Sequence, residues 1–267
     1  MSWDVRVRGA AALVVLAACG TAAAADERHP WIASPAVVQP PTTYFVNLRD
    51  GDRIETPFVV KFGLSRYGLA PIVSGVPHTG HHHMLVNRDL PLDFNQPLPF
   101  NDQYVHFGKG QMETVLTFPP GTYMLRLLLA DHKHIPHFIY SKPVTVTVEK
   151  KNEAVDPKTL VKAGVQLLEP RSGAVVQGAF KVQFHASGLN VSHTGLKEAG
   201  TGHFALVAQR AGKPDERIVF AGGATEAWLK PPAADYVLRL QFVRNAAPND
   251  VMAVSEPVSV TVAPNAY

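Results

Sequence analysis

The sequence predicts an all-β protein made of two tandem immunoglobulin-like β-sandwich domains. Segments of the chain recur in the same order in its two halves, which indicates a duplicated domain. Each copy consists of short β-branched or aromatic runs separated by Pro, Gly, Asn and Asp, the pattern of a β-sandwich. In each copy a tyrosine, Tyr123 or Tyr236, follows a Pro-Pro turn and opens a long apolar strand. This arrangement is typical of the tyrosine corner of immunoglobulin-like domains.

The internal repeat sets the domain organisation. Segments of the first copy at 59–65, 79–86, 107–114, 123–128 and 141–148 match 181–187, 201–208, 220–227, 236–241 and 255–262. Two copies of about a hundred residues fit the usual size of a domain. We therefore expect a histidine-rich domain over 35–150, a linker over 151–163 and a degenerate copy over 164–264.

The first copy contains seven predicted strands. They lie at 43–48, 58–65, 81–86, 102–107, 113–118, 123–130 and 144–149. Because Tyr123 marks strand F, 113–118 becomes strand E and 81–86 becomes strand C. In this fold the connections B–C, D–E and F–G meet at one end of the sandwich, so we expect side chains near them to come together.

Residues 1–25 resemble an export signal, with a weakly basic start followed by nine apolar residues at 10–18. That apolar run is too short to remain as a membrane-spanning helix. Two cleavage sites compete: 16–19 match a bacterial lipobox, and 23–25 match the small-residue rule of ordinary signal peptidase. Because Cys19 is the single cysteine of the chain, we expect its lipidation. The sequence thus predicts an exported protein, periplasmic or anchored to the outer membrane, whose membrane contact is through the lipid.

Composition excludes several classes of function. Hydrophobic residues make up 46% of the chain and charged residues 18%, enough apolar side chain to bury a core. A formal net charge of +3 is too small to neutralise a row of phosphates, so we expect no nucleic-acid partner. A single cysteine excludes an intrachain disulfide and a thiolate-rich metal site.

Histidine is the distinctive residue, because eight of the twelve lie between His78 and His137. Side chains alternate across a strand, so His81 and His83 share one face while His82 points to the other. Neutral imidazole is a common ligand of zinc, copper, iron and nickel, and among these we expect copper or zinc. The predicted metal ligands, delivered by three separate stretches, are His81, His83, His106, His132, His134 and His137.

Other side chains near this group have chemistry that suits a metal. Met84 and Met112 offer thioethers compatible with copper(I). Glu113 and Asp131 offer carboxylates, either as ligands or as acceptors that orient a histidine. His29, His185 and His193 lie outside the group, and we expect no special role for them.

The second copy serves as an internal control for the histidines. His81 aligns with His203, whereas His83 aligns with Ala205 and His106 with Val219. The turn histidines of the first copy, His132, His134 and His137, align with Asn245, Ala247 and Asp250. Since the same fold is predicted without five of the six histidines, we expect their role in the first copy to be functional.

The stretch from Tyr44 to Lys150 resembles an exported bacterial domain family catalogued as a domain of unknown function. The resemblance rests on Gly-His-His-His at 80–83, His-Phe-Gly-x-Gly-Gln at 106–111 and a Pro-Pro-Gly turn at 119–121. It ends in Asp-x-x-His-x-Pro-His at 131–137, where Ala130 replaces the family's usual glycine. The resemblance implies an exported domain and brings no established activity.

Three functions remain open, with no catalytic residue assigned. The leading hypothesis is a binding protein that holds copper or zinc. The second is a hydrolytic or oxidative metalloenzyme, with Glu113, Asp131 or His106 as the general base; the sequence contains no nucleophile elbow and no phosphate loop. The third is a non-metal module that binds an envelope protein or glycan through exposed aromatic residues. Those residues would be Tyr67, Phe94, Phe100 and Tyr104.

Overall fold

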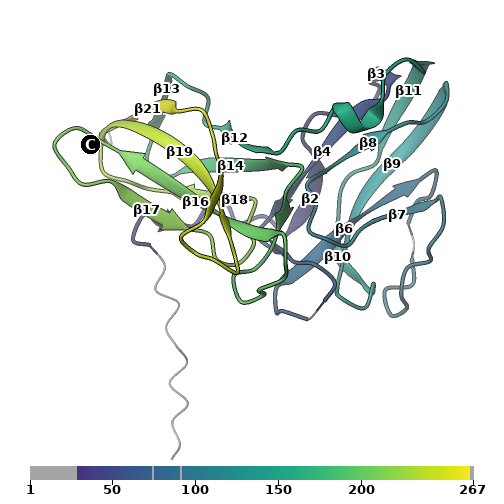
Figure 1. The fold of residues 1–267 in the computed structure, drawn as a ribbon, viewed down its shortest axis with the longest axis horizontal. Helices are drawn as coiled ribbons and strands as arrows, with labels where there is room; N and C mark the ends of the chain where they lie inside the picture. Colours follow the sequence, from purple (N-terminus) through teal and green to yellow (C-terminus); the bar gives the residue numbers. More distant parts are fainter. Residues whose placement is uncertain (1–28, 74, 91, 265–267) are drawn as a thin grey trace, which may run out of the picture.

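The computed structural model of the protein describes residues 29–73, 75–90 and 92–264. It consists of two β-sandwiches in succession, and this confirms the predicted fold class (Figure 1). The predicted export signal and Cys19 lie outside the described residues. Within the described part of the chain, no helix has the length and apolar character needed to cross a bilayer.

The first sandwich consists of a three-stranded sheet and a larger sheet packed against it. The smaller sheet has the order β2 (Thr42–Phe45), β4 (Phe58–Ser65), β8 (Glu113–Leu116). The larger has the order β3 (Arg53–Thr56), β11 (Val144–Lys151), β9 (Gly121–Ala130), β6 (Thr79–Val86), β5 (Gly68–Leu69). Two further strands extend it: β7 (Tyr104–Phe107) pairs with β6, and β10 (Pro136–Tyr140) pairs with β9.

The second sandwich repeats this arrangement after a single 3-10 turn at Pro157–Thr159. One sheet has the order β1 (Ile32–Ala33), β18 (Glu226–Leu229), β14 (Phe180–Ser187), β12 (Gly164–Glu169). The other has the order β13 (Ala174–Gln177), β21 (Val258–Ala263), β19 (Ala234–Arg244), β16 (Thr201–Gln209), β15 (Asn190–Val191). Here β17 (Glu216–Val219) pairs with β16, and β20 (Val251–Val254) pairs with β19. The short strand β1 precedes the first domain in sequence but pairs with the second.

The tyrosine corners are formed in both copies. The Tyr123 hydroxyl donates to the Pro119 carbonyl at 3.0 Å, and the Tyr236 hydroxyl donates to the Pro232 carbonyl at 2.8 Å. Each bond reaches back four residues to the turn that precedes the strand, which fixes how β9 and β19 enter their sheets.

The strand β10 is the main element that the sequence pattern missed, whereas β11 covers the strand expected at 144–149. Ser141 lies between them, and its Oγ accepts from the Leu127 amide at 2.9 Å and donates to the Lys142 carbonyl at 2.6 Å. Ser255 makes the same pair of bonds to Leu240 and Glu256 in the second copy. The serine thus interrupts strand pairing at the same place in both domains, and β10 is too short to show an apolar alternation.

Both faces of β6 are buried, and the two faces differ in what covers them. His82 and Met84 point inward, toward Phe62 of the opposing sheet. Leu85 points outward and packs with Leu98 and other residues of the long connection that follows β6. That connection therefore covers the outer face of the sheet, where His81 and His83 also lie.

The two domains share a continuous interface. The Leu64 amide donates to Thr225 Oγ1 at 3.0 Å, and the Val191 amide donates to the Gly110 carbonyl at 2.9 Å. Met112 of the first domain packs in the same apolar cluster as Phe184 of the second. The second sandwich thus buries one side of the first.

Candidate metal centre

Four histidines converge on the outer face of the larger sheet of the first domain. His81 and His83 come from β6, and the antiparallel register places His106 of β7 directly opposite His83. His134 comes from the turn between β9 and β10, next to the end of β9 that pairs with His81. One ligand nitrogen from each of the four side chains lies within 4.8 Å of the other three.

The imidazoles face one another in two close pairs. The Nε2 atoms of His81 and His83 are 2.9 Å apart, and those of His106 and His134 are 3.1 Å apart. The ring centroids of His81 lie 4.9 Å from His106 and 5.1 Å from His134, so the two pairs form one group. We call these four residues the histidine cluster.

The turn that carries His134 is shaped by Asp131. The Asp131 carboxylate accepts the backbone amides of Lys133 at 2.8 Å and Ile135 at 2.9 Å, which closes a tight turn. Within that turn His134 has a φ of 65°, a left-handed conformation that is uncommon for a residue with a Cβ. Asp131 therefore orients the turn rather than pairing with an imidazole.

Burial keeps the cluster neutral. Desolvation, together with the neighbouring imidazoles, lowers the pKa of His81 to about 2 and that of His83 to about 3. Burial also lowers the pKa values of His106 and His134, which are only partly covered. Neutral imidazole is the form that binds a metal ion, so the ligand set is ready at ordinary pH.

The two buried histidines lack good hydrogen-bond partners within the protein. His81 and His83 are each 1% exposed, and the Nδ1 atom of each has no partner among the described residues. An unsatisfied buried polar atom costs on the order of 1–3 kcal/mol. The two Nδ1 atoms are therefore unfavourably buried, while the two Nε2 atoms face each other at 2.9 Å.

Phe100 covers the outward side of the cluster. Its ring centroid lies 4.9 Å from His134 and 5.5 Å from His106, while its side chain remains 69% exposed. The long connection after β6 thus places an aromatic ring over the two half-buried ligands.

The structure brings four of the six predicted ligands together and places the other two elsewhere. His137 lies beside Tyr67, with Nε2 3.3 Å from the Thr79 carbonyl. The His132 ring lies against Gly75. His82 points into the sandwich, as the alternation predicts, and its Nδ1 lies 3.1 Å from Thr43 Oγ1.

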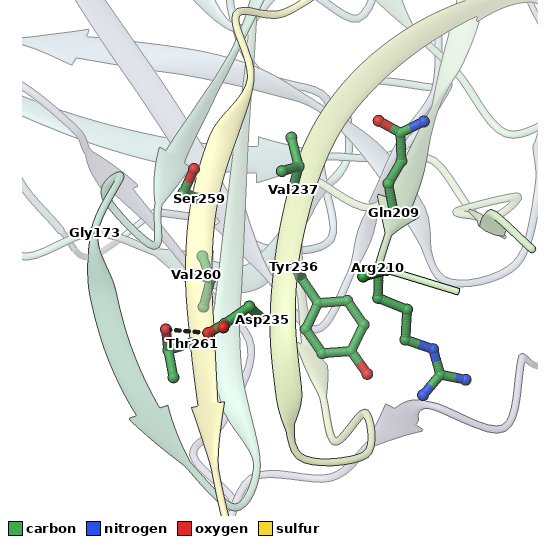
Figure 2. Close-up of a pocket in the computed structure, with 10 residues that line it drawn as sticks. Gly173, Gln209, Arg210, Asp235, Tyr236, Val237, Ser259, Val260 and Thr261 are labelled. Atoms are coloured by element: carbon green, nitrogen blue, oxygen red, sulfur yellow. Dashed lines mark hydrogen bonds between the residues drawn. The ribbon is translucent and has the colours of Figure 1, made fainter. Parts of the chain in front are cut away.

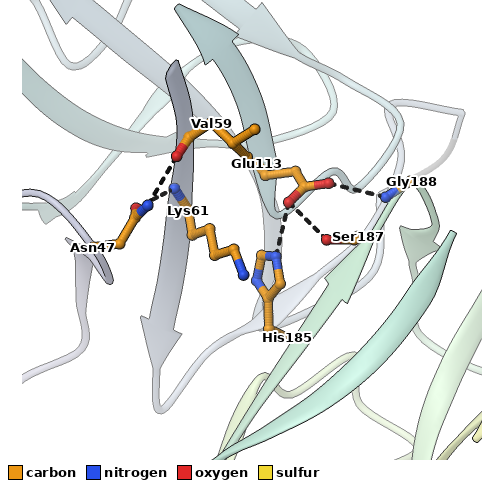
Figure 3. A network of polar contacts seen from close by, with 7 residues as sticks. All are labelled: Asn47, Val59, Lys61, Glu113, His185, Ser187 and Gly188. Carbon is orange, nitrogen blue, oxygen red and sulfur yellow. Dashed lines mark hydrogen bonds and ion pairs between the residues drawn. The ribbon is translucent and has the colours of Figure 1, made fainter. Parts of the chain in front are cut away.

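Three of the accessory residues suggested by the sequence do not reach the cluster. Met84 lies in the core of the first sandwich, on the inner face of β6. Met112 packs in the apolar cluster that joins the domains. Glu113, considered above as ligand or general base, lies at the domain interface because β8 belongs to the opposing sheet (Figure 3).

The Glu113 carboxylate binds the second domain through three donors. It lies 2.9 Å from His185 Nε2, accepts the Ser187 hydroxyl at 2.9 Å and accepts the Gly188 amide at 3.1 Å (Figure 3). Burial raises the pKa of Glu113, but the contacts with His185 and the other donors outweigh it and hold the pKa below its ordinary value. This interface role of His185 gave no signal in the sequence pattern.

The second domain keeps the backbone of the site without its ligands. In its sheet Ala205 lies opposite Val219, as His83 lies opposite His106 in the first domain. His203, the counterpart of His81, has Nδ1 2.8 Å from Asn245 Oδ1. The register supports the sequence alignment of the two copies and shows that the fold does not require the cluster.

A surface depression also lies on the second domain, away from these histidines in sequence. It has a volume of about 560 Å³ and is lined by residues that include Arg210, Asp235 and Tyr236 (Figure 2). Asp235 accepts the Thr261 hydroxyl at 2.6 Å, so its carboxylate is already engaged.

The fold and the site define a protein of two immunoglobulin-like sandwiches that has a four-histidine cluster on the first. The chain belongs to the family described as Domain of unknown function (DUF4399), which matches residues 60–149 and 182–263. The two matched segments confirm the duplication predicted from the sequence. No curated protein matches the chain.

Solved structures with related architecture are distant in sequence. The fibronectin(III)-like modules of CbhA from Clostridium thermocellum are 14% identical, with 84% of this chain and 94% of that chain covered and a TM-score of 0.27. The FN1–FN3 domains of chicken CNTN1 are 11% identical, with 84% and 68% covered and a TM-score of 0.24. The strand order of the four sheets defines the fold.

Proposed function

We propose that the protein is an exported, lipid-anchored module that binds one copper or zinc ion through the histidine cluster. The observation that carries the proposal is the convergence of four imidazole nitrogens, from three separate elements, within 4.8 Å of one another. Three or four such ligands are what a tetrahedral zinc site or a copper site requires.

The state of the buried ligands supports binding of a cation. His81 and His83 are kept neutral by burial, and their Nε2 atoms lie 2.9 Å apart with no carboxylate between them. A metal ion would use both lone pairs at once. The second domain, which has Ala205 and Val219 in place of His83 and His106, supports the view that these histidines serve a ligand rather than the fold.

The number of imidazoles favours a binding role over catalysis. Catalytic zinc sites have three protein ligands and leave one position for water or substrate, whereas four protein ligands close the coordination shell. One nitrogen of each cluster member lies within 4.8 Å of the other three. Of the three suggested bases, Glu113 lies at the domain interface, Asp131 closes the turn and His106 belongs to the cluster itself. The metal ion is therefore the proposed partner itself, with an envelope protein as the source or recipient of that metal.

The proposal of export rests on the sequence of 1–25 and on Cys19 at its lipobox position. Acylation of this cysteine would attach the mature protein to the membrane. Because a bacterial lipoprotein carries several acyl chains, no second anchoring signal would be needed. The histidine cluster would then be held in the envelope, outside the cytoplasm.

The test is the metal content of the untagged mature protein, purified from the envelope without chelators and measured by plasma mass spectrometry. We expect about one copper or zinc per chain, and none in the His81→Asn/His83→Asn variant. His193→Ala, which changes a histidine of the second domain, is the matched control and should keep the metal. Absence of metal that persists after incubation with copper and zinc salts would contradict the proposal.

A further inference from the structure

Three histidines that do not belong to the cluster line a pocket on the other side of the same turn. His132 and Asp131 come from the turn after β9, His137 comes from β10, and His78 directly precedes β6. Together with Tyr67 they surround a space of about 310 Å³ that opens to solvent. We call this space the turn pocket.

The aromatic contacts of the turn pocket hold its imidazoles around one space. The Tyr67 ring contacts two of them, with its centroid 5.2 Å from His137 and 5.9 Å from His78. The His132 ring packs so closely on Gly75 that a Cβ there would lie 2.7 Å from it. A side chain at position 75 would therefore displace His132 from the pocket.

His78 occupies a backbone position that favours glycine. Its φ is 57°, and the residue at the equivalent place in the second domain is Gly200, with a φ of 75°. A left-handed conformation is unfavourable for a residue with a Cβ, and glycine adopts it freely. The first domain thus keeps a histidine where the fold alone would favour glycine.

The same place in the second domain is closed. Asn245, the counterpart of His132, is 1% exposed, and its side-chain amide donates to the carbonyls of His193 and Leu196 at 2.9 Å each. The Asn245 side chain therefore bonds two carbonyl groups of the neighbouring loop and is buried at the place where the first domain has an open pocket. In the first domain a histidine at this position leaves an open pocket lined by imidazoles, which the fold does not need.

We infer that the turn pocket is a second transition-metal site, distinct from the histidine cluster, that binds Cu²⁺ or Zn²⁺ through His78, His132 and His137. Imidazoles with a neighbouring carboxylate are suitable ligands for these ions. Asp131 lines the same space and disfavours an anionic ligand. The three imidazoles must rotate to converge, so this site is weaker than the cluster, whose four nitrogens already lie within 4.8 Å of one another.

Calorimetric titration of the untagged protein with Cu²⁺ and, separately, Zn²⁺ tests the inference. We expect a second equivalent that binds at least about tenfold more weakly than the first. The His132→Asn/His137→Asn variant, which uses the asparagine found at position 245, should lose the weaker equivalent alone. A number of bound equivalents that this variant leaves the same as in the wild type would overturn the inference.

The two sites can be separated in the same experiment. His106→Asn/His134→Asn removes two half-buried ligands of the cluster and should abolish the tight equivalent while the weak one persists. Near-ultraviolet circular dichroism of each variant checks that the fold is intact, and His193→Ala controls for a histidine outside both sites. If the wild type lacks the tight equivalent but binds the one that His132→Asn/His137→Asn removes, the proposed function is wrong and the inference about the turn pocket holds.

Discussion

The Nε2 atoms of His81 and His83 lie 2.9 Å apart on one face of β6, and both side chains are 1% exposed. In the metal-free protein at most one of the two nitrogens donates a hydrogen to the other, and neither Nδ1 atom has a partner among the described residues. Protonation would place a charge in a buried site beside three other imidazoles. A metal ion, in contrast, would use both lone pairs.

Replacement of His83 by alanine, the residue of the second domain at this place, should weaken metal binding without unfolding the protein. The lost packing destabilises the fold, while removal of an unsatisfied nitrogen stabilises it, each by on the order of 1–3 kcal/mol. We expect a net change of about 1 kcal/mol in the free energy of unfolding of the metal-free protein, measured by urea denaturation with a chelator present. A loss above about 4 kcal/mol would mean that His83 is a structural residue.

Acid should destabilise the metal-free protein well above the pH at which carboxylates titrate. Burial lowers the pKa values of His81, His82 and His83 to about 2–3 in the folded state, whereas the value in an unfolded chain is about 6.5. Below pH 6.5 the unfolded chain therefore takes up protons that the folded chain does not. The free energy of unfolding is fully retained above this pH and falls toward pH 3, by up to about 1.4 kcal/mol per histidine and pH unit.

Urea denaturation of the metal-free protein between pH 7.5 and 4.5 measures this effect. His83→Ala should show a shallower decline than the wild type, because one depressed group is removed. Equal slopes in the two proteins would be inconsistent with a buried neutral His83.

The pH dependence of metal affinity should lie below the range of an ordinary histidine. The sequence alone predicts that affinity falls as the pH drops through about 6.5. In the structure the pKa values of all four ligands are lowered, mainly by burial. We therefore expect the affinity for zinc to change little between pH 7.5 and 6.5 and to fall at lower pH. A steep loss centred at pH 6.5, seen in competition titrations with a chelator, would indicate exposed ligands.

Phe100 should slow the exchange of bound metal. Its ring covers the outward side of His106 and His134, so Phe100→Ala exposes the ligands to solvent and to chelators. We expect faster transfer of metal to an excess of chelator, followed in a stopped-flow spectrometer. Phe138→Ala is the matched control, because Phe138 is 79% exposed, stacks on Phe94 and makes no aromatic contact with the cluster. Equal exchange rates in the two variants would exclude a covering role.

Glu113→Gln should weaken the domain interface and leave metal binding unchanged. The carboxylate is surrounded by His185, Ser187 and the Gly188 amide of the second domain, and it lies in a different sheet from the cluster. Loss of these charge-assisted bonds should lower the free energy of unfolding by about 1–3 kcal/mol. Loss of metal in this variant, in a protein that remains folded, would place Glu113 near the metal after all.

The sequence was sufficient to predict the sandwich fold and the shared face of His81 and His83, because both follow from the alternation of side chains on strands. It was not sufficient to choose among the histidines after β9. The left-handed conformation of His134 within the Asp131 turn directs that residue to the cluster, while His132 and His137 line the turn pocket. Such a choice depends on the geometry of one turn, which residue spacing does not encode.

The position of Glu113 illustrates a second limit. Its proximity in sequence to the His106 segment suggested a role at the metal, but β8 lies in the sheet that faces the second domain. Only the packing of the two copies against each other reveals the partner of this carboxylate. The alignment of the two copies predicted neither the packing of the domains against each other nor the role of His185 in their interface.

X-ray absorption spectroscopy of the protein loaded with one equivalent of zinc tests the central claim most directly. If the ion is held by His81, His83, His106 and His134, the spectrum will show four nitrogen ligands at about 2.0–2.1 Å, with the scattering pattern of imidazole rings. The same measurement on His106→Asn should show one imidazole fewer. A wild-type spectrum with fewer than three imidazoles, or one unchanged by the His106 substitution, would contradict the assignment of the metal to the histidine cluster.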